Sequence, residues 1–158
     1  MKNKENHLLF WLVALGGFLL DQITKMVVFR FLYPGEVREV WPGVFRLRPW
    51  TQTGMAWGLF GGHNLALTIV SMLAIVTVIA VFLVLASRLD GQTIFALGLI
   101  TAGATGNLCD RIFVGRVRDL LDFYLIGWPI FNIADVLICI GAGVMIFKML
   151  KESKATRK

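Results

Sequence analysis

Residues 65–86, LALTIVSMLAIVTVIAVFLVLA, contain no charged side chain. As an α-helix this stretch would be about 33 Å long, enough to cross a hydrocarbon core of about 30 Å. The 158-residue chain as a whole has 57% hydrophobic residues, 16% charged residues and a mean hydropathy of +0.73. Soluble domains are far less apolar. The sequence therefore predicts a single membrane-embedded domain spanning residues 1–158.

Three further apolar stretches predict transmembrane helices at about residues 8–29, 91–109 and 130–147. The fold class we expect is an all-α membrane protein with four transmembrane helices. A cleavable signal peptide ending near the small residues at 14–16 is an alternative for the first span. The apolar pattern continues beyond that point, which favours an uncleaved helix.

The connection at residues 30–64 is the one substantial loop. It contains two apolar–basic stretches, EVREVW and VFRLRPW, each preceded by a Pro-Gly turn signal. Phe45 and Leu47 alternate with Arg46 and Arg48, which is the period of a β-strand. We expect a small β-hairpin on the membrane surface, with an ordinary exposed loop as the alternative. Trp41, Trp50 and Trp57 suit that depth, because amphipathic rings favour the interface.

Four spans place both termini on the same side of the membrane. The tail after residue 147 is basic, which favours a cytoplasmic C-terminus. The opposite side would also carry arginines, so the contrast between the two sides is small. The formal net charge of +6 is explained by basic residues that flank the spans. No nucleic-acid partner is expected.

Several kinds of catalytic site are excluded by what the chain lacks. The only histidines are His7 and His63, too few for an ordinary histidine metal site. No GxSxG, P-loop or dinucleotide-binding motif occurs. We therefore expect no metal and no cofactor, and the candidate chemistry rests on acids, amides and basic residues at membrane depth.

Four polar clusters interrupt the apolar sequence. They are DQITK with Asp21 and Lys25 four residues apart; QTGMAWG at residues 52–58; GNLCDR with Asn107, Asp110 and Arg111 on one helix face; and VRDLLDFYLIGWPIFNIAD with Asp119, Asp122, Asn132 and Asp135. An acid inside an apolar span, such as Asp135, is unfavourable and indicates function. For Asp21 and Lys25 a local ion pair at the interface is the simpler interpretation, and for Asp122 a solvated loop acid.

A pair of aspartates is the chemistry that fits this inventory. Two carboxylates held close together share a proton, because both cannot ionise easily. One can then activate a water molecule while the other protonates a scissile carbonyl. Spacing alone leaves an alternative open, a proton- or cation-coupled carrier, since such carriers also place acids in the membrane.

The motifs DQITK, GNLCDRIFVGRVRDLLDF and WPIFNIAD make the chain resemble the lipoprotein signal peptidases (signal peptidase II), a family of bacterial aspartyl membrane proteases. The resemblance covers nearly the whole length. It implies a catalytic pair of Asp119 and Asp135, and a surface β-cradle that agrees with the expected hairpin. It also implies supporting or substrate-binding roles for Asn107, Asp110, Arg111, Asn132, Asp21, Lys25, Gln52 and Gly54.

The resemblance further implies the substrate and the setting. The substrate would be a diacylglyceryl-modified bacterial prolipoprotein, cut just before its lipidated cysteine. The enzyme would lie among phospholipids in the cytoplasmic (inner) membrane, with both termini in the cytoplasm and the active site near the outer face. Nothing in the sequence demands more than a monomer.

The chain departs from the family pattern at two informative positions. Gln52 stands where asparagine is usual, which lengthens the arm that carries the amide. Arg118 stands where an apolar residue is common, directly before Asp119. We expect the Arg118 side chain to point outward, to lipid phosphates, rather than toward the aspartate pair.

Overall fold

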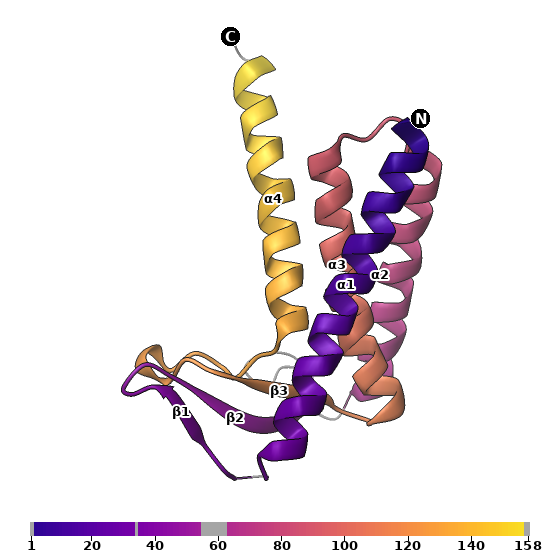
Figure 1. Ribbon diagram of the computed structural model, residues 1–158. Coiled ribbons are helices and arrows are strands. Elements are labelled where there is room, and N and C mark those ends of the chain that lie inside the picture. The colour runs from indigo at the N-terminus through magenta and orange to yellow at the C-terminus, as the bar shows by residue number, and fades with distance from the viewer. Residues whose placement is uncertain (1, 34, 55–62, 157–158) are drawn as a thin grey trace.

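Four long helices and a small antiparallel sheet make up the fold (Figure 1). The computed structural model describes residues 2–33, 35–54 and 63–156. The helices are α1 (Lys2–Phe31), α2 (Asn64–Leu85), α3 (Gly91–Phe113) and α4 (Ile133–Thr156). The strands are β1 (Arg38–Trp41), β2 (Phe45–Gln52) and β3 (Val117–Asp122), and a short 3-10 helix, η2, covers Tyr124–Ile126. The prediction of a four-helix membrane fold with a small surface sheet is confirmed.

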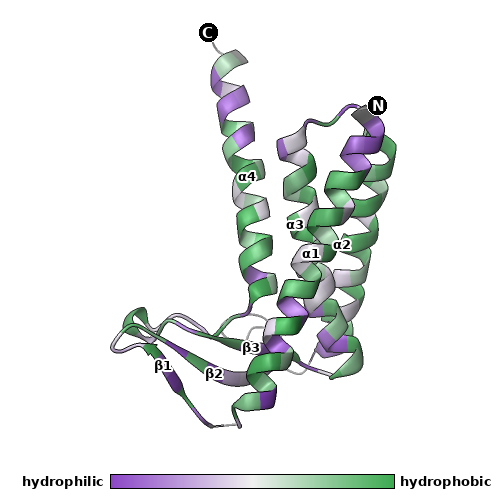
Figure 2. Ribbon diagram, viewed as in Figure 1, coloured by the Kyte–Doolittle hydropathy of each residue, from purple (hydrophilic) through white to green (hydrophobic). Residues whose placement is uncertain are grey.

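Three of the described helices are long and apolar enough to cross a membrane, namely α1, α2 and α4. Their outward faces expose large apolar side chains such as Leu73, Val84 and Phe147, which suits contact with lipid rather than water. Figure 2 shows the apolar residues along the helices, with hydrophilic residues concentrated at the helix ends and on the sheet. The helices form a multi-pass membrane protein.

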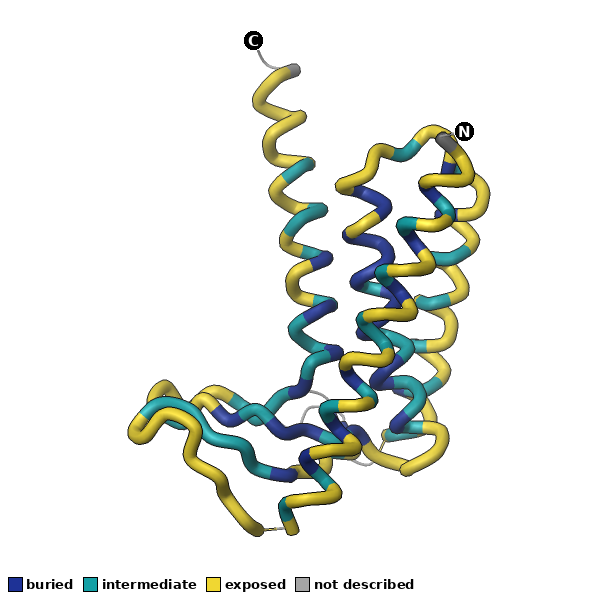
Figure 3. The backbone as a smooth tube through the Cα atoms, viewed as in Figure 1, coloured by how far each residue is buried: buried dark blue, intermediate teal, exposed yellow. Residues whose placement is uncertain are grey.

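The third helix, α3, is the centre of the bundle. It packs against α1, α2 and α4, and it carries the longest run of buried residues (Figure 3). Glycines permit the close approach of α3 to α4. A Cβ added at Gly103 would lie 2.2 Å from the carbonyl oxygen of Ala134, and one added at Gly141 would lie 2.7 Å from that of Ala96. Small residues at helix crossings are the usual means of packing helices in membranes.

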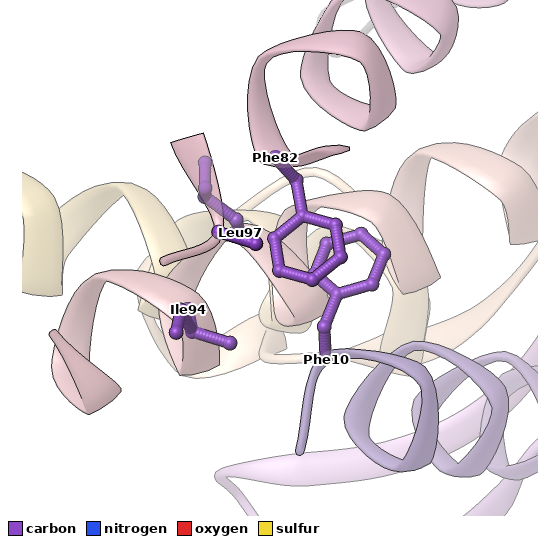
Figure 4. Close-up of a cluster of buried hydrophobic side chains, with 5 residues drawn as sticks. Phe10, Phe82, Ile94 and Leu97 are labelled. Atoms are coloured by element: carbon purple, nitrogen blue, oxygen red, sulfur yellow. The ribbon is translucent and has the colours of Figure 1, made fainter. Parts of the chain in front are cut away.

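An aromatic cluster holds α1, α2 and α3 together at the end of the bundle where the chain begins (Figure 4). The rings of Phe10 and Phe82 stack with their centroids 3.9 Å apart, and both side chains are fully buried. Ile94 and Leu97 of α3 pack against them. This cluster lies at the end of the bundle opposite the sheet, so it stabilises the helices without contributing to the polar residues there.

The sheet lies at the other end of the helices from the two chain termini (Figure 1). Its strand order is β1-β2-β3, and both neighbouring pairs are antiparallel. The expected hairpin is β1 and β2. Strand β3 was not anticipated; it pairs with β2 and places Asp119 opposite Trp50. Trp41 and Trp50 are exposed as expected for the interface, whereas Trp57 lies outside the described residues.

Candidate active site

The first turn of α4 carries Asp135, and its geometry is set by the residue that precedes the helix. The backbone N–H of Asp135 donates to Asn132 Oδ1 at 3.0 Å, and the backbone N–H of Asn132 donates to Asp135 Oδ2 at 3.2 Å. This reciprocal pair has the form of a capping box, which satisfies N–H groups that a helix start leaves unpaired. The start of α4 therefore fixes the Asp135 carboxylate.

Strand β3 brings Asp119 to the same place. The backbone N–H of Phe131 donates to the carbonyl of Leu121 at 3.1 Å, and the N–H of Leu121 donates back at 2.9 Å. This bridge holds the segment before α4 against β3. As a result, Asn132 Nδ2 donates to Asp119 Oδ1 at 2.7 Å. Asn132 thus contacts both aspartates, one through its side chain and the other through its backbone.

Asn107 of α3 completes the contacts around the pair. Its Nδ2 donates to Asp135 Oδ1 at 2.8 Å. Its Oδ1 accepts from Asn132 Nδ2 at 3.1 Å and from Lys25 Nζ at 3.2 Å. Residues from α1, α3 and α4 therefore meet in one continuous hydrogen-bonded network beneath the sheet.

A group of ion pairs lies directly behind this network. Lys25 Nζ is 2.9 Å from Asp21 Oδ2 and 3.2 Å from Asp110 Oδ2, and all three side chains are fully buried. Asp21 Oδ1 also accepts from the backbone N–H of Ala134, at 2.9 Å. The expected i, i+4 pair of Asp21 and Lys25 is present, but in the protein interior rather than at the interface. The hydrogen bond from Ala134 to Asp21 ties α1 to the start of α4.

Asp119 and Asp135 differ from these acids in their partners. Their described hydrogen bonds come from amide groups, and within residues 2–33, 35–54 and 63–156 neither has a cation within ion-pair distance. Burial, and then the negative charge of Asp135, raise the pKa of Asp119 to about 7. The hydrogen bond from Asn132 and the charge of Lys25 oppose this rise. Asp119 can therefore hold a proton near neutral pH.

Three other predicted site residues lie near the end of α3 and at the end of β2. Arg111 Nη1 donates to the backbone oxygen of Asn107 at 3.4 Å, while its buried Nε has no hydrogen-bond partner among the described residues. Gln52 is the last residue of β2, and Gly54 is buried just beyond it. The remainder of that motif, residues 55–58, lies outside the described residues. Gln52 pairs with Val117, two residues before Asp119 on β3.

Two expectations from the sequence are wrong. Asp122 is not solvated: it is 4% exposed, and its Oδ2 accepts from Arg46 Nε at 2.7 Å, which joins β3 to β2. Arg118 does not point outward to lipid. Its Nη2 lies 2.6 Å from Asp110 Oδ1 and donates to Gln22 Oε1 at 2.9 Å. A buried carboxylate within reach attracts the guanidinium more strongly than mobile lipid phosphates do, because the interior screens charge less.

Gln22 contacts this network but was not among the site residues predicted from the sequence. It belongs to the quoted DQITK motif, and its Nε2 donates to Asp21 Oδ2 at 3.0 Å and to the backbone oxygen of Gly106 at 3.2 Å. The signal that could have identified Gln22 is its position directly after Asp21. No group of three or more metal-ligating His, Cys, Asp or Glu side chains occurs in the described part of the chain.

Comparison with known proteins places this arrangement in a family. The family model described as signal peptidase (SPase) II matches residues 13–151. The chain belongs to the signal peptidase II family. It is 37% identical to a lipoprotein signal peptidase of Gloeobacter violaceus, over 93% of this chain and 84% of that protein. It is 42% identical to the Cyanothece lipoprotein signal peptidase, over 84% of this chain and 78% of that protein.

The fold has solved relatives as well. A bacterial membrane enzyme determined by the in meso method at 2.3 Å resolution superposes with a TM-score of 0.83 at 30% identity, covering 90% of this chain and 87% of that one. A second such structure, at 1.9 Å resolution, gives a TM-score of 0.78 at 31% identity. It covers 89% of this chain and 91% of that one. The signal peptidase II family consists of aspartic-type peptidases, so the protein is a membrane protease.

Proposed function

We propose that this protein removes the signal peptide from diacylglyceryl-modified prolipoproteins, cutting just before the lipidated cysteine, with Asp119 and Asp135 as the catalytic pair. The observation that carries the assignment is the position of Asn132, which donates its side-chain amide to Asp119 at 2.7 Å and its backbone N–H to Asp135 at 3.2 Å. Membership of the signal peptidase II family supports the substrate class.

The pair supplies both an acid and a base. With a pKa of about 7, Asp119 holds the shared proton near neutral pH, so we assign it the acid role and Asp135 the base role. Asp135 takes a proton from a water molecule, whose oxygen attacks the scissile carbonyl carbon. Asp119 gives its proton to the carbonyl oxygen, which forms a tetrahedral intermediate. When the C–N bond breaks, Asp135 gives its proton to the leaving amine, and Asp119 takes a proton back from one hydroxyl of the intermediate, which re-forms the carbonyl and restores the pair.

The other predicted residues have supporting roles in this proposal. Asn107 and Asn132 orient the two carboxylates through the contacts described above. Asp21, Lys25 and Asp110 hold α1, α3 and the start of α4 in place around them. Arg111, Gln52 and Gly54 are assigned to substrate binding.

The setting that we propose follows from the distribution of charge. Both termini lie at the opposite end of the helices from the sheet (Figure 1), and the terminal end of α4 carries Lys148, Lys151 and Lys154. The positive-inside rule then puts the termini in the cytoplasm and the aspartates near the outer face of the bacterial inner membrane. Phospholipids would cover the exposed apolar helix faces. A monomer is sufficient, because one chain supplies every contact of the pair.

Cleavage of a lipidated precursor peptide by the purified protein in detergent tests the proposal. We expect release of the signal segment by the unaltered protein, and loss of that activity in both Asp119→Asn and Asp135→Asn. Asp122→Asn is the matched control, since this neighbouring acid contacts Arg46 and not the pair. Cleavage at the normal rate by either catalytic variant would refute the assignment, and an inactive parent protein would refute the substrate class.

A further inference from the structure

Arg118 joins three elements immediately next to a catalytic aspartate. Its backbone N–H donates to Asp110 Oδ2 at 2.9 Å, and its Nε and Nη2 donate to Asp110 Oδ1 at 3.1 and 2.6 Å. Nη2 also donates to Gln22 Oε1 at 2.9 Å. A single side chain on β3 therefore binds the end of α3 and the middle of α1. Since Asp119 is the next residue, this clamp restricts the backbone that carries it.

The charge of Arg118 also balances a buried group of acids. Asp21 and Asp110 are both fully buried, and the one amine between them is Lys25. Arg118 supplies the second cation, and its side chain is only 19% exposed. Without Arg118, the fixed charges behind the aspartate pair would be two acids and one base.

The buried charges are connected to the aspartate pair through Lys25. Lys25 donates to Asn107 Oδ1, and Asn107 in turn donates to Asp135. If Arg118 no longer held Asp110, Lys25 would be drawn toward Asp110 and away from Asn107. One continuous chain of contacts therefore runs from Arg118 to both catalytic carboxylates.

We propose that Arg118 is a positioning residue for the peptidase reaction: its clamp on Asp110 and Gln22 fixes the strand that carries Asp119 and keeps the buried charges beside the aspartate pair in balance. This inference rests on the proposed catalytic pair. It assigns Arg118 no contact with substrate. Its effect is exerted through Asp110 and through the backbone of β3.

The pH dependence of the reaction distinguishes this role from simple stabilisation of the fold. The negative charge of Asp110 raises the pKa of Asp119. Arg118 forms an ion pair with Asp110 and so compensates that charge. The described charged groups around Asp119 come from each packed element: Asp21 and Lys25 of α1, Asp110 and Arg111 of α3, Asp135 of α4, and Arg118 of β3. Of these, only Arg118 is changed in the test.

The experiment measures kcat and KM from pH 5 to 9 for cleavage of the lipidated precursor peptide. Because small displacements of a catalytic group can lower rates by about 100-fold, we expect Arg118→Gln to lower kcat by about 10- to 100-fold with little change in KM. The alkaline limb of its pH profile should move to higher pH. Arg118→Lys keeps the charge but loses the planar fork, so its alkaline limb should stay in place while kcat falls by a smaller factor.

Two further variants complete the test. Gln22→Met removes one acceptor of the clamp without changing charge, so kcat should fall slightly at an unchanged pH profile. Arg116→Gln removes an exposed arginine two residues away and should behave as the parent. The inference would be overturned if Arg118→Gln kept the parental kcat. It would also be overturned if the alkaline limb of the pH profile moved as far in Arg118→Lys as in Arg118→Gln. If either outcome occurred while the unaltered protein still cleaved the precursor, the inference about Arg118 would fail but the proposed peptidase function would stand.

Discussion

Replacing Asn132 by serine separates its two structural roles, the cap on α4 and the hydrogen bond to Asp119. A serine hydroxyl can still cap α4 by accepting from the backbone N–H of Asp135, as Asn132 Oδ1 now does at 3.0 Å. It cannot supply the amide N–H groups that reach Asp119 at 2.7 Å and Asn107 at 3.1 Å. Asn132→Ser should therefore preserve the helix start while removing the contact that holds Asp119.

The magnitude follows from the kind of hydrogen bond that is lost. A bond to a charged group contributes about 1.5–3 kcal/mol, and Asn132 is fully buried. If that contribution is realised in the transition state, kcat/KM should fall by about 10- to 150-fold. The bond also lowers the pKa of Asp119, which is about 7, so its loss should raise that pKa. The alkaline limb, where Asp119 loses its proton, should then move to higher pH.

The assay is cleavage of the lipidated precursor peptide across pH 5–9, together with thermal unfolding in detergent. Asn132→Ala is the matched comparison, because it loses the cap as well and should unfold with about 1 kcal/mol less stability than Asn132→Ser. If Asn132→Ser retained the parental kcat/KM and an unmoved alkaline limb, the amide contact to Asp119 would have no part in catalysis. The reasoning from this contact would then be refuted.

Two other predictions concern packing and metal. Gly103→Ala should lower the free energy of unfolding by about 1–3 kcal/mol, seen as a reduced Tm in detergent, because the new Cβ would meet the carbonyl oxygen of Ala134 at 2.2 Å. Gly143→Ala, on the facing helix with nothing within 4 Å of its added Cβ, should leave Tm near the parental value. Incubation with EDTA should leave the rate of precursor cleavage unchanged, since the proposed acid and base are both carboxylates; a rate that falls on chelation and returns with added metal would contradict the mechanism.

Much of the fold could be predicted from hydropathy, and the differences have physical causes. The apolar stretch at 65–86 became α2, and the alternation around Phe45 became β2. The ends of the helices were harder to predict. Helix α4 begins at Ile133 rather than at residue 130, because Asn132 and Asp135 form the cap there. Strand β3 was missed because its apolar and charged residues do not alternate. Its pairing depends on β2, a partner distant in sequence.

The site could be predicted only in part from the residues themselves. Spacing marked Asp135 as unusual, but it left a carrier as an alternative and did not select its partner. The family resemblance selected Asp119. Arg118 was assigned the wrong direction, and Asp122 the wrong surroundings, because the decisive partners Asp110 and Arg46 lie on other elements. Side-chain direction near a buried charge is a tertiary property.

The partners of the described buried acids differ in a way that supports the proposed catalytic pair. In the described chain, Asp21 and Asp110 are neutralised by Lys25 and Arg118, and Asp122 is paired with Arg46. Each of these three carboxylates therefore has its charge compensated by a neighbouring cation.

Asp119 and Asp135 instead receive hydrogen bonds from amide groups. Amides orient a carboxylate without supplying a full opposing charge, which suits the shared proton of the proposed pair. The ion pairs behind them compensate the charges of the surrounding acids, which supports the proposal that Asp119 and Asp135 act as the acid and base.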